Sequence, residues 1–346
     1  MRTIEQLLGI EAPLIQAPMA GSQDSRLAIA VADAGGLGSL PTALMSPETL
    51  QTQVAAIRAA TSAPFNLNFF CHEPPAPDAP REEAWRAQLA PYYRELGVDP
   101  STIPEAPVRA PFTHDIADLL DRDPPRVVSF HFGLPAPDLL ARVKRWRAVV
   151  LSSATTFEEG QWLEANGADV VIAQGLEAGG HRGMFLTTDV TTQVGTFALV
   201  ERLAGTLAVP VIAAGGISTP KGVRAATALG AAGVQTGTVY LLSTEAMTAP
   251  LHRAALASPG VGNTAVTHLF TGRPARSIVN RLMRELGAMG AEPPAFPLAG
   301  GAIMPLRTTA EDRGSSDFSP LWAGQNAAAC RESTAGEITR DLCAGF

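Results

Sequence analysis

The chain has 346 residues and a formal net charge of −7, from 26 lysines and arginines against 33 aspartates and glutamates. It has no basic excess with which to follow a phosphate backbone, which argues against a nucleic-acid partner. Hydrophobic residues make up 46% of the chain and charged residues 17%, the composition of a globular protein with a sizeable core and not of a disordered chain.

The sequence also bears on the compartment. No apolar run reaches the roughly 18 residues that a membrane helix needs, so we expect no membrane partner. Glu5 and Glu11 fall where a signal peptide needs an unbroken apolar stretch. The three cysteines, Cys71, Cys330 and Cys343, form neither a CxxC pair nor an even disulfide set. These features predict a soluble, reduced, cytoplasmic protein.

Short apolar runs alternate with longer amphipathic stretches through most of the chain, the pattern of βα units around a parallel sheet. The expected strands are Pro13–Ala17, Leu37–Leu40, Phe65–Phe69, Val127–Phe130, Val149–Ser152, Val170–Ala173, Val209–Ala213 and Gly233–Thr236. The expected helices are Ser25–Ala34, Ser46–Thr61, Ile116–Arg122, Ala136–Trp146, Thr156–Asn166, Thr191–Leu207 and Pro220–Leu229. Eight strands with helical crossovers match an α/β fold of the (β/α)8 TIM barrel type. The competing architecture, a doubly wound sheet, would open with a GxGxxG turn, and Ala17–Gly21 lacks one.

Two stretches interrupt this alternation. Nine of the 28 prolines lie between Cys71 and Pro111, which predicts an irregular insertion with at most a short helix around Arg81–Arg94. Because the insertion follows the third strand, we expect it on the C-terminal face of the barrel, where active-site loops lie. Beyond residue 257, Gly/Pro-rich turns predict an extension with short helices at Arg276–Met289 and Pro320–Arg331. We therefore expect a barrel over 1–257, with an insertion at about 71–111, and a mostly helical extension over 258–346 packed on it.

Two glycine turns follow the last two expected strands, in the segments PVIAAGGIST and GAAGVQTGT. Gly215, Gly216 and Gly237 let backbone N–H groups approach an anion, and the next helix adds its positive dipole end. In a barrel of this type these two loops form the usual phosphate site. The pattern predicts a phosphate site, although a phosphate alone does not distinguish a flavin nucleotide from a sugar phosphate.

His181 is the strongest candidate for a catalytic side chain. It lies among glycines in the loop QGLEAGGHRG directly after the sixth expected strand, at the barrel end where catalysis occurs. Its neighbour Arg182 either holds an anionic substrate or points to solvent. His131, at the end of the fourth strand, either lines the same pocket or packs in the core between phenylalanines. Asn68 and Gln174 end the third and sixth strands, where they would contact a flavin ring or satisfy buried backbone groups.

The residues that other classes of enzyme need are missing from the expected positions. A Schiff-base enzyme needs a lysine at a strand end, and Lys144 and Lys221 both fall on expected helices. Cys71 opens the insertion, away from the phosphate turns. We find no metal-ligand pattern and no GxSxG turn. The remaining histidines, His72, His114, His252 and His268, have no comparable placement and are expected in structural or surface roles. This profile suits a flavin enzyme, because the cofactor carries the electron chemistry.

Taken together, these residues resemble the nitronate monooxygenases, formerly called 2-nitropropane dioxygenases, and more closely their bacterial class with an AGGHRG loop. The matching segments are APMAG (17–21), DAGGLG (33–38), NLNFF (66–70), FHFG (130–133), AQGLEAGGHRG (173–183), AAGGI (213–217), GVQTGT (233–238), FTGRPAR (270–276) and LWAGQ (321–325). AGGHRG together with FHFG and LWAGQ makes the resemblance specific.

The resemblance implies FMN bound without a covalent bond at the C-terminal face of the barrel. Its implied flavin contacts are Ala17, Pro18, Met19, Asn68, Gln174, Gly179, Gly216, Gln235, Thr236, Gly237 and Thr238. The two glycine-rich loops add Gly180 and Gly215 to the predicted cofactor-binding set. The family's catalytic base falls on His181, and His131 matches a second pocket histidine. No metal site is predicted.

The implied reaction starts when an alkyl nitronate gives an electron to FMN. Oxygen then completes its conversion to a carbonyl compound and nitrite, and a neutral nitroalkane would first lose a proton to His181. The expected partners are thus a small nitronate or nitroalkane and O2, with no prediction of oligomeric state. The alternatives are an NAD(P)H-dependent FMN reductase of quinones or enoyl thioesters and a flavin-free isomerase or lyase. The proline-rich insertion and the apolar segment Ala299–Arg307, which we expect at the pocket rim, depart from the family pattern. The sequence therefore does not predict which nitronate or nitroalkane is the physiological substrate.

Overall fold

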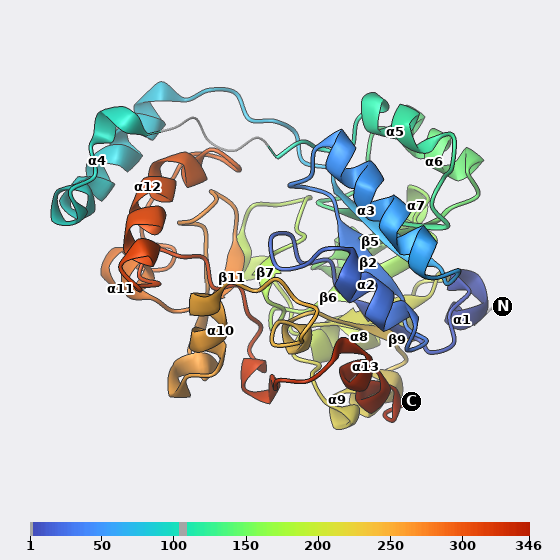
Figure 1. Ribbon diagram of the computed structural model, residues 1–346. Helices are drawn as coiled ribbons and strands as arrows, with labels where there is room; N and C mark the ends of the chain where they lie inside the picture. Colours follow the sequence, from blue (N-terminus) through green and yellow to red (C-terminus); the bar gives the residue numbers. More distant parts are fainter. Residues whose placement is uncertain (1–2, 104–108) are drawn as a thin grey trace.

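The computed structural model describes residues 3–103 and 109–346, and the parallel strands of its main sheet lie in the half of the molecule that holds both termini (Figure 1). The barrel strands are β1 (Leu14–Gln16), β2 (Gly38–Pro41), β3 (Phe65–Phe70), β4 (Val127–His131), β5 (Val149–Ala154), β6 (Val170–Gln174), β8 (Val211–Ala214) and β9 (Gly233–Thr236). Their order is β1-β9-β8-β6-β5-β4-β3-β2, and a parallel bridge between Ile15 and Leu37 closes the ring. The predicted TIM barrel is therefore confirmed, with every expected strand present.

The strands are short apolar runs because both of their faces are covered. Ile15, Leu37, Leu151 and Ile172 belong to the cluster inside the barrel, and all of them are buried. The short helix α1 (Ile4–Leu8), which the sequence pattern did not predict, contributes to the same cluster through Ile4 and Leu8.

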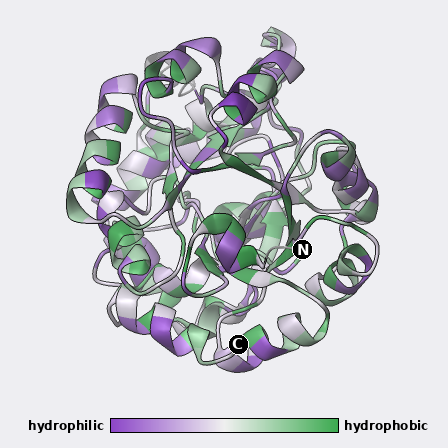
Figure 2. Cartoon of the chain, turned by 90° about the vertical axis from the view of Figure 1, so that its right-hand side faces the viewer, coloured by the Kyte–Doolittle hydropathy of each residue, from purple (hydrophilic) through white to green (hydrophobic). Residues whose placement is uncertain are grey.

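An outer layer of helices surrounds the strands, with hydrophobic and hydrophilic residues on different faces (Figure 2). It consists of α2 (Ser25–Ala32), α3 (Pro47–Ala60), α5 (His114–Leu120), α6 (Pro137–Arg145), α7 (Phe157–Ala165), α8 (Thr196–Ala204), which follows the 3-10 turn η2 (Val190–Thr192), and α9 (Pro220–Ala228). The last helix, α13 (Ala335–Cys343), packs with α2 and α9 and fills the place of the eighth barrel helix. Its Ile338 and Leu342 share one buried cluster with Leu27 of α2 and Val223 of α9.

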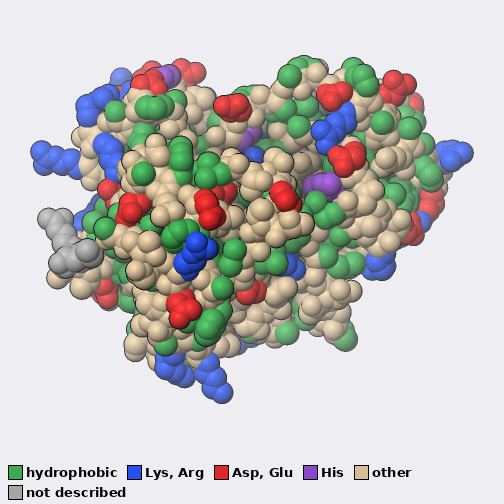
Figure 3. All heavy atoms as spheres, turned by 180° about the vertical axis from the view of Figure 1, so that it is seen from behind, with side chains coloured by type: hydrophobic (Ala, Val, Ile, Leu, Met, Phe, Trp, Pro, Cys, Tyr) green, Lys and Arg blue, Asp and Glu red, His purple; other side chains and the backbone are tan. Residues whose placement is uncertain are grey.

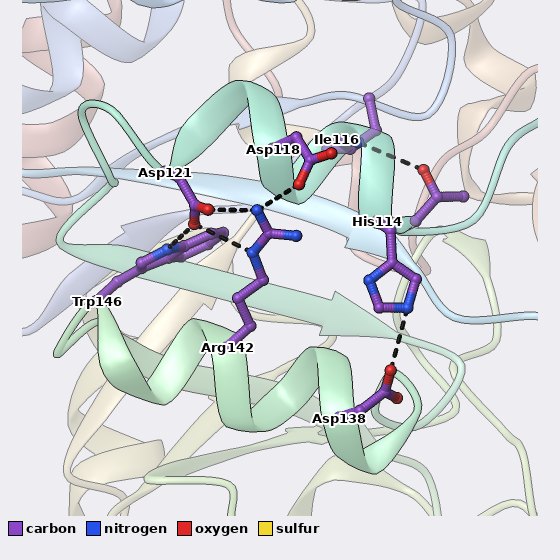
Figure 4. A network of polar contacts seen from close by, with 8 residues as sticks. His114, Ile116, Asp118, Asp121, Asp138, Arg142 and Trp146 are labelled. Carbon is purple, nitrogen blue, oxygen red and sulfur yellow. Dashed lines mark hydrogen bonds and ion pairs between the residues drawn. The ribbon is translucent and has the colours of Figure 1, made fainter.

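Polar contacts tie neighbouring outer helices together at the surface. Figure 4 shows Arg142 of α6 reaching two aspartates, Asp118 of α5 and Asp121 at its C-terminal end, while Trp146 donates to Asp121 across 2.7 Å. The Arg142 guanidinium and the Trp146 N–H lower the pKa of Asp121. Acidic and basic side chains are intermixed on the face that Figure 3 shows.

The insertion after β3 contains a long helix where at most a short one was expected. Helix α4 covers Ala79–Leu96, followed by the 3-10 turn η1 (Pro100–Thr102), while residues 104–108 of the insertion lie outside the described residues. The prolines misled the prediction, because Pro80 lies in the first turn, where a missing N–H costs little, and the helix also continues through Pro91 in its interior. The decisive signal is the spacing of the buried side chains, which are Trp85, Leu89, Tyr92 and Tyr93.

The extension also differs from its predicted form. The segment expected as a helix at Arg276–Met289 begins as strand β11 (Ala275–Ile278) and becomes helical only in α11 (Arg281–Leu286). Pro320–Arg331 contains only the 3-10 turn η5 (Ala327–Ala329). Between β9 and residue 258 lie η3 (Thr238–Tyr240) and α10 (Pro250–Leu256). The extension also contains η4 (Pro259–Gly262), β10 (Thr264–Thr267) and α12 (Ala299–Asp312). Its three α-helices, α11, α12 and α13, cover less than half of residues 258–346, so the extension is less helical than predicted.

Helix α12 lies against α4, on the side of the molecule away from both termini (Figure 1). Tyr93 donates its hydroxyl proton to the Ala302 carbonyl across 2.7 Å, and Trp85 donates to Ala299 across 3.3 Å. The apolar segment Ala299–Arg307 thus forms a helix that packs on the insertion. None of its residues lines the cavity described below, so its expected place at the pocket rim is wrong.

No helix within the described residues is both long enough and apolar enough to cross a membrane.

Candidate active site

A cavity of about 200 Å³ opens at the C-terminal ends of the barrel strands. Every site residue predicted from the sequence lines it. These are Ala17, Pro18, Met19, Asn68, His131, Gln174, Gly179, Gly180, His181, Gly215, Gly216, Gln235, Thr236, Gly237 and Thr238. Strands β1, β3, β4, β6, β8 and β9 bring these residues together, because the carboxyl ends of parallel strands meet at one end of a barrel.

The glycine turns give the cavity a close-fitting wall. Gly215 and Gly216 have φ angles of +123° and +70°, which side chains rarely adopt. A methyl group added at Gly179 would lie 2.5 Å from the backbone nitrogen of Gly324, so the loop after β6 passes directly against the extension. Next to these turns, the Gln235 Oε1 atom is buried without a hydrogen-bond partner within the described residues. An unpaired buried polar atom in a glycine-lined cavity indicates a polar ligand.

His181 is held by contacts that the sequence did not reveal. It forms the two-residue strand β7 (Gly180–His181), which pairs antiparallel with Ala275 and Arg276 of β11. Its Nε2 atom lies 2.9 Å from the Thr271 hydroxyl oxygen. Burial lowers the pKa of His181 well below its usual value, and the nearby Arg109 guanidinium lowers it further. The imidazole is therefore neutral.

His131 has no nitrogen left for proton transfer. Its Nε2 lies 3.2 Å from the His181 carbonyl oxygen, which can only accept, so Nε2 carries the proton. Its Nδ1 lies 3.1 Å from the Ser153 hydroxyl and accepts from it. Burial lowers the pKa of His131 to about 3. In this arrangement the His131 ring holds the backbone of His181 in place.

The side-chain amides of Gln174 and Asn68 form hydrogen bonds within the protein. Gln174 donates to the His181 carbonyl across 2.9 Å and accepts from the Gly183 N–H across 2.7 Å, so both ends of its amide hold the loop. Asn68 donates to the Ser129 hydroxyl across 2.9 Å. Gln174 was expected either to contact a flavin ring or to satisfy buried backbone groups, and its side chain here does the second.

Arg182 fits neither of its two predicted roles. Its side chain is fully buried, donates to the Gln174 carbonyl across 2.7 Å and to Gln193 across 2.8 Å, and does not line the cavity. Burial lowers its pKa to about 9. Arg182 points away from the cavity, because alternate residues of an extended segment point in opposite directions, and its hydrogen bonds hold the loop that carries His181.

An aromatic wall, which sequence reasoning missed, surrounds His181. Its ring lies 5.4 Å from both Trp322 and Phe296, and 6.2 Å from Phe132, between ring centroids. His72 also packs on Phe296, 4.8 Å away, and burial lowers the pKa of His72 to about 4. Thr271 and Trp322 belong to the motifs FTGRPAR and LWAGQ, which were identified in the sequence. The sequence does not predict where these motifs lie relative to the barrel, so their contact with His181 was not expected.

The remaining expectations concern other reactive groups. Lys144 and Lys221 lie on α6 and α9, as predicted. Burial raises the pKa of the Cys71 thiol, and Cys71 does not line the cavity. His114 lies at the surface beside Asp138, whereas His252 is buried. In the part of the chain that the structure describes, no cluster of three or more His, Cys, Asp or Glu side chains is placed to hold a metal ion.

Comparisons with known proteins agree with this geometry. A sequence model described as nitronate monooxygenase matches residues 2–345. A curated nitronate monooxygenase from Pseudomonas aeruginosa is 42% identical over 345 residues, which cover 97% of each chain. Another from Paraburkholderia phytofirmans is 40% identical, covering 99% of this chain and 94% of that protein. The solved structure of a nitroalkane oxidase from Streptomyces ansochromogenes has a TM-score of 0.87 at 36% identity, covering 97% of this chain and 95% of that one. The chain therefore belongs to the nitronate monooxygenase family and is an oxidoreductase.

Proposed function

We propose that the protein is an FMN-dependent nitronate monooxygenase, which oxidises small alkyl nitronates with O2 to a carbonyl compound and nitrite. The observation that carries this proposal is the placement of the His181 imidazole, which lines the cavity between aromatic rings and a glycine-lined wall. Family membership and the likeness to a nitroalkane oxidase support the substrate class.

The cavity fits the proposed cofactor. The turns at Gly215–Gly216 and Gly237–Thr238 would hold the phosphate, and the segment Ala17–Met19 would lie along the flavin ring. The unpartnered Gln235 Oε1 would contact a polar group of the bound molecule. When bound, FMN takes up electrons from the nitronate and delivers them to oxygen.

The residues of the chain handle the proton and the shape of the site. Thr271 donates its hydroxyl proton to the Arg273 carbonyl across 3.4 Å, so its oxygen accepts from His181 Nε2–H. Nδ1 of His181 then keeps a free lone pair, the arrangement a general base needs. Because its pKa is well below the usual value, His181 is a weak base, which favours preformed nitronates over neutral nitroalkanes.

The variant His181→Asn tests the proton step. Neutral nitroethane must lose a proton and ethyl nitronate has already lost it, so we expect a loss of at least about a hundredfold on nitroethane, against a few-fold on the nitronate. Steady-state oxygen uptake on each substrate measures both losses. Equal losses on the two substrates would remove His181 from proton abstraction and assign it to binding.

The function itself is tested by the cofactor and the products. Heat-released cofactor from the purified protein should have the mass of FMN. With ethyl nitronate and oxygen but no nicotinamide, the enzyme should release nitrite and acetaldehyde in equal amounts. A preparation that forms neither product and instead consumes NADH or NADPH with a quinone would belong to the reductase alternative.

A further inference from the structure

Arg109 is the cationic side chain of the insertion that reaches the cavity. It lies at the return of the insertion to the barrel, is half-buried and lines the cavity wall. Its guanidinium carbon lies 5.6 Å from the centre of the Phe296 ring, and the His181 ring lies 5.4 Å from the same centre. Arg109 and His181 therefore flank one aromatic ring at the same end of the cavity.

Within residues 3–103 and 109–346, no carboxylate neutralises this end of the cavity. Neither an aspartate nor a glutamate occurs among the described residues that line it, and none of the ion pairs within the described residues includes Arg109. The nearby Arg273 stacks on Phe132 at 3.7 Å and donates only to a backbone carbonyl, that of Met184. A guanidinium that is partly removed from water without a counter-ion is costly, so its presence indicates an anionic ligand.

We propose that the Arg109 guanidinium binds the two oxygens of the substrate's nitro group, as the subsite for the nitronate anion. This inference rests on the proposed function. When His181 takes the proton next to the nitro group, the C–H bond breaks and an N–H bond forms on the imidazole. The electron pair of the broken bond forms a C=N bond, and the negative charge moves onto the two oxygens. The planar fork of an arginine matches two oxygens on one nitrogen, as it matches a carboxylate.

A direct binding experiment tests this subsite without turnover. Nitrate is a planar anion that resembles the nitronate group, and isothermal titration of the FMN-loaded protein measures its dissociation constant. We expect Arg109→Gln to weaken nitrate binding by about tenfold or more, the loss of one charge-assisted contact. Arg109→Lys keeps the charge but loses the fork, so its affinity should fall between the two.

A matched control separates the anion contact from ring packing. Arg202 also lies over a phenylalanine, Phe157, at 3.8 Å, but it does not line the cavity. Arg202→Gln should leave nitrate binding and activity unchanged. In steady state, Arg109→Gln should raise KM for ethyl nitronate about tenfold and change KM for neutral nitroethane little.

The outcomes distinguish the subsite from the function. An unchanged nitrate affinity and KM in Arg109→Gln, with an active wild-type enzyme, would overturn the subsite and leave the proposed function standing. A wild-type protein that oxidises no nitronate but loses nitrate binding on substitution would overturn the function and keep the subsite.

Discussion

At the residue scale, the site depends on which nitrogen of His181 carries the proton. The carbonyl of His181 accepts from His131 and Gln174, and its ring meets Thr271, so backbone and side chain are both fixed. When the Thr271 hydroxyl donates to the Arg273 carbonyl, its oxygen accepts from His181 Nε2–H, and the lone pair of the ring lies on Nδ1. Thr271 thus acts as a positioning residue through His181.

Replacing Thr271 tests this assignment. Thr271→Val keeps the shape but removes the acceptor, so turnover of nitroethane should fall about five- to tenfold, the worth of one hydrogen bond. Thr271→Ser should restore it. Nitrogen NMR of the histidine rings should show the Nε2–H form in the wild type and a mixture in the valine variant. Identical spectra in both proteins would contradict the role of Thr271.

At the scale of elements, the sequence predicted what local pattern determines. Apolar runs and glycine turns predicted the position of each barrel strand. They also predicted that the site residues lie at one end of the barrel. The pairing of β7 with β11 could not be predicted, because a two-residue strand exists only through a partner from a distant segment. Helix α4 was misjudged because its prolines were counted without regard to their position in the helix.

The contact between the β6–β7 loop and the extension is testable at Gly179. A methyl group there would meet backbone atoms of Ala323 and Gly324 within 2.6 Å, so the loop must shift. We expect Gly179→Ala to lose about 1–3 kcal/mol of unfolding free energy and to release FMN more readily. Urea denaturation and flavin fluorescence measure the two effects. Gly262→Ala, where a methyl group meets nothing within 4 Å, is the control, and equal effects in both variants would contradict the close contact.

At the scale of the whole molecule, buried neutral histidines make stability depend on pH. Burial lowers the pKa of His131 to about 3 and that of His252 to about 4. The unfolded chain binds protons on these rings below about pH 6.5, whereas the folded chain does not. Folding stability should therefore fall as the pH drops from 7 toward 4.

The size of this acid effect can be measured with His252, which lies on α10 outside the cavity. Because His252 is protonated only in the unfolded chain, it should lower the free energy of unfolding of the wild type by about 2 kcal/mol at pH 5 relative to pH 7. His252→Gln should lose that part of the pH dependence in urea denaturation, while His114→Gln, at the surface, should keep it. The same slope in the wild type and in His252→Gln would show that His252 is not held neutral by the fold.

The central claim, that a nitronate and not a nicotinamide is the electron donor, is tested most directly by oxygen uptake of the FMN-loaded protein. Ethyl nitronate alone, with no NADH or NADPH, should start rapid oxygen consumption accompanied by nitrite. Absence of uptake with the nitronate, together with bleaching of the flavin by NADH or NADPH without oxygen, would contradict the account and place the protein among the reductases.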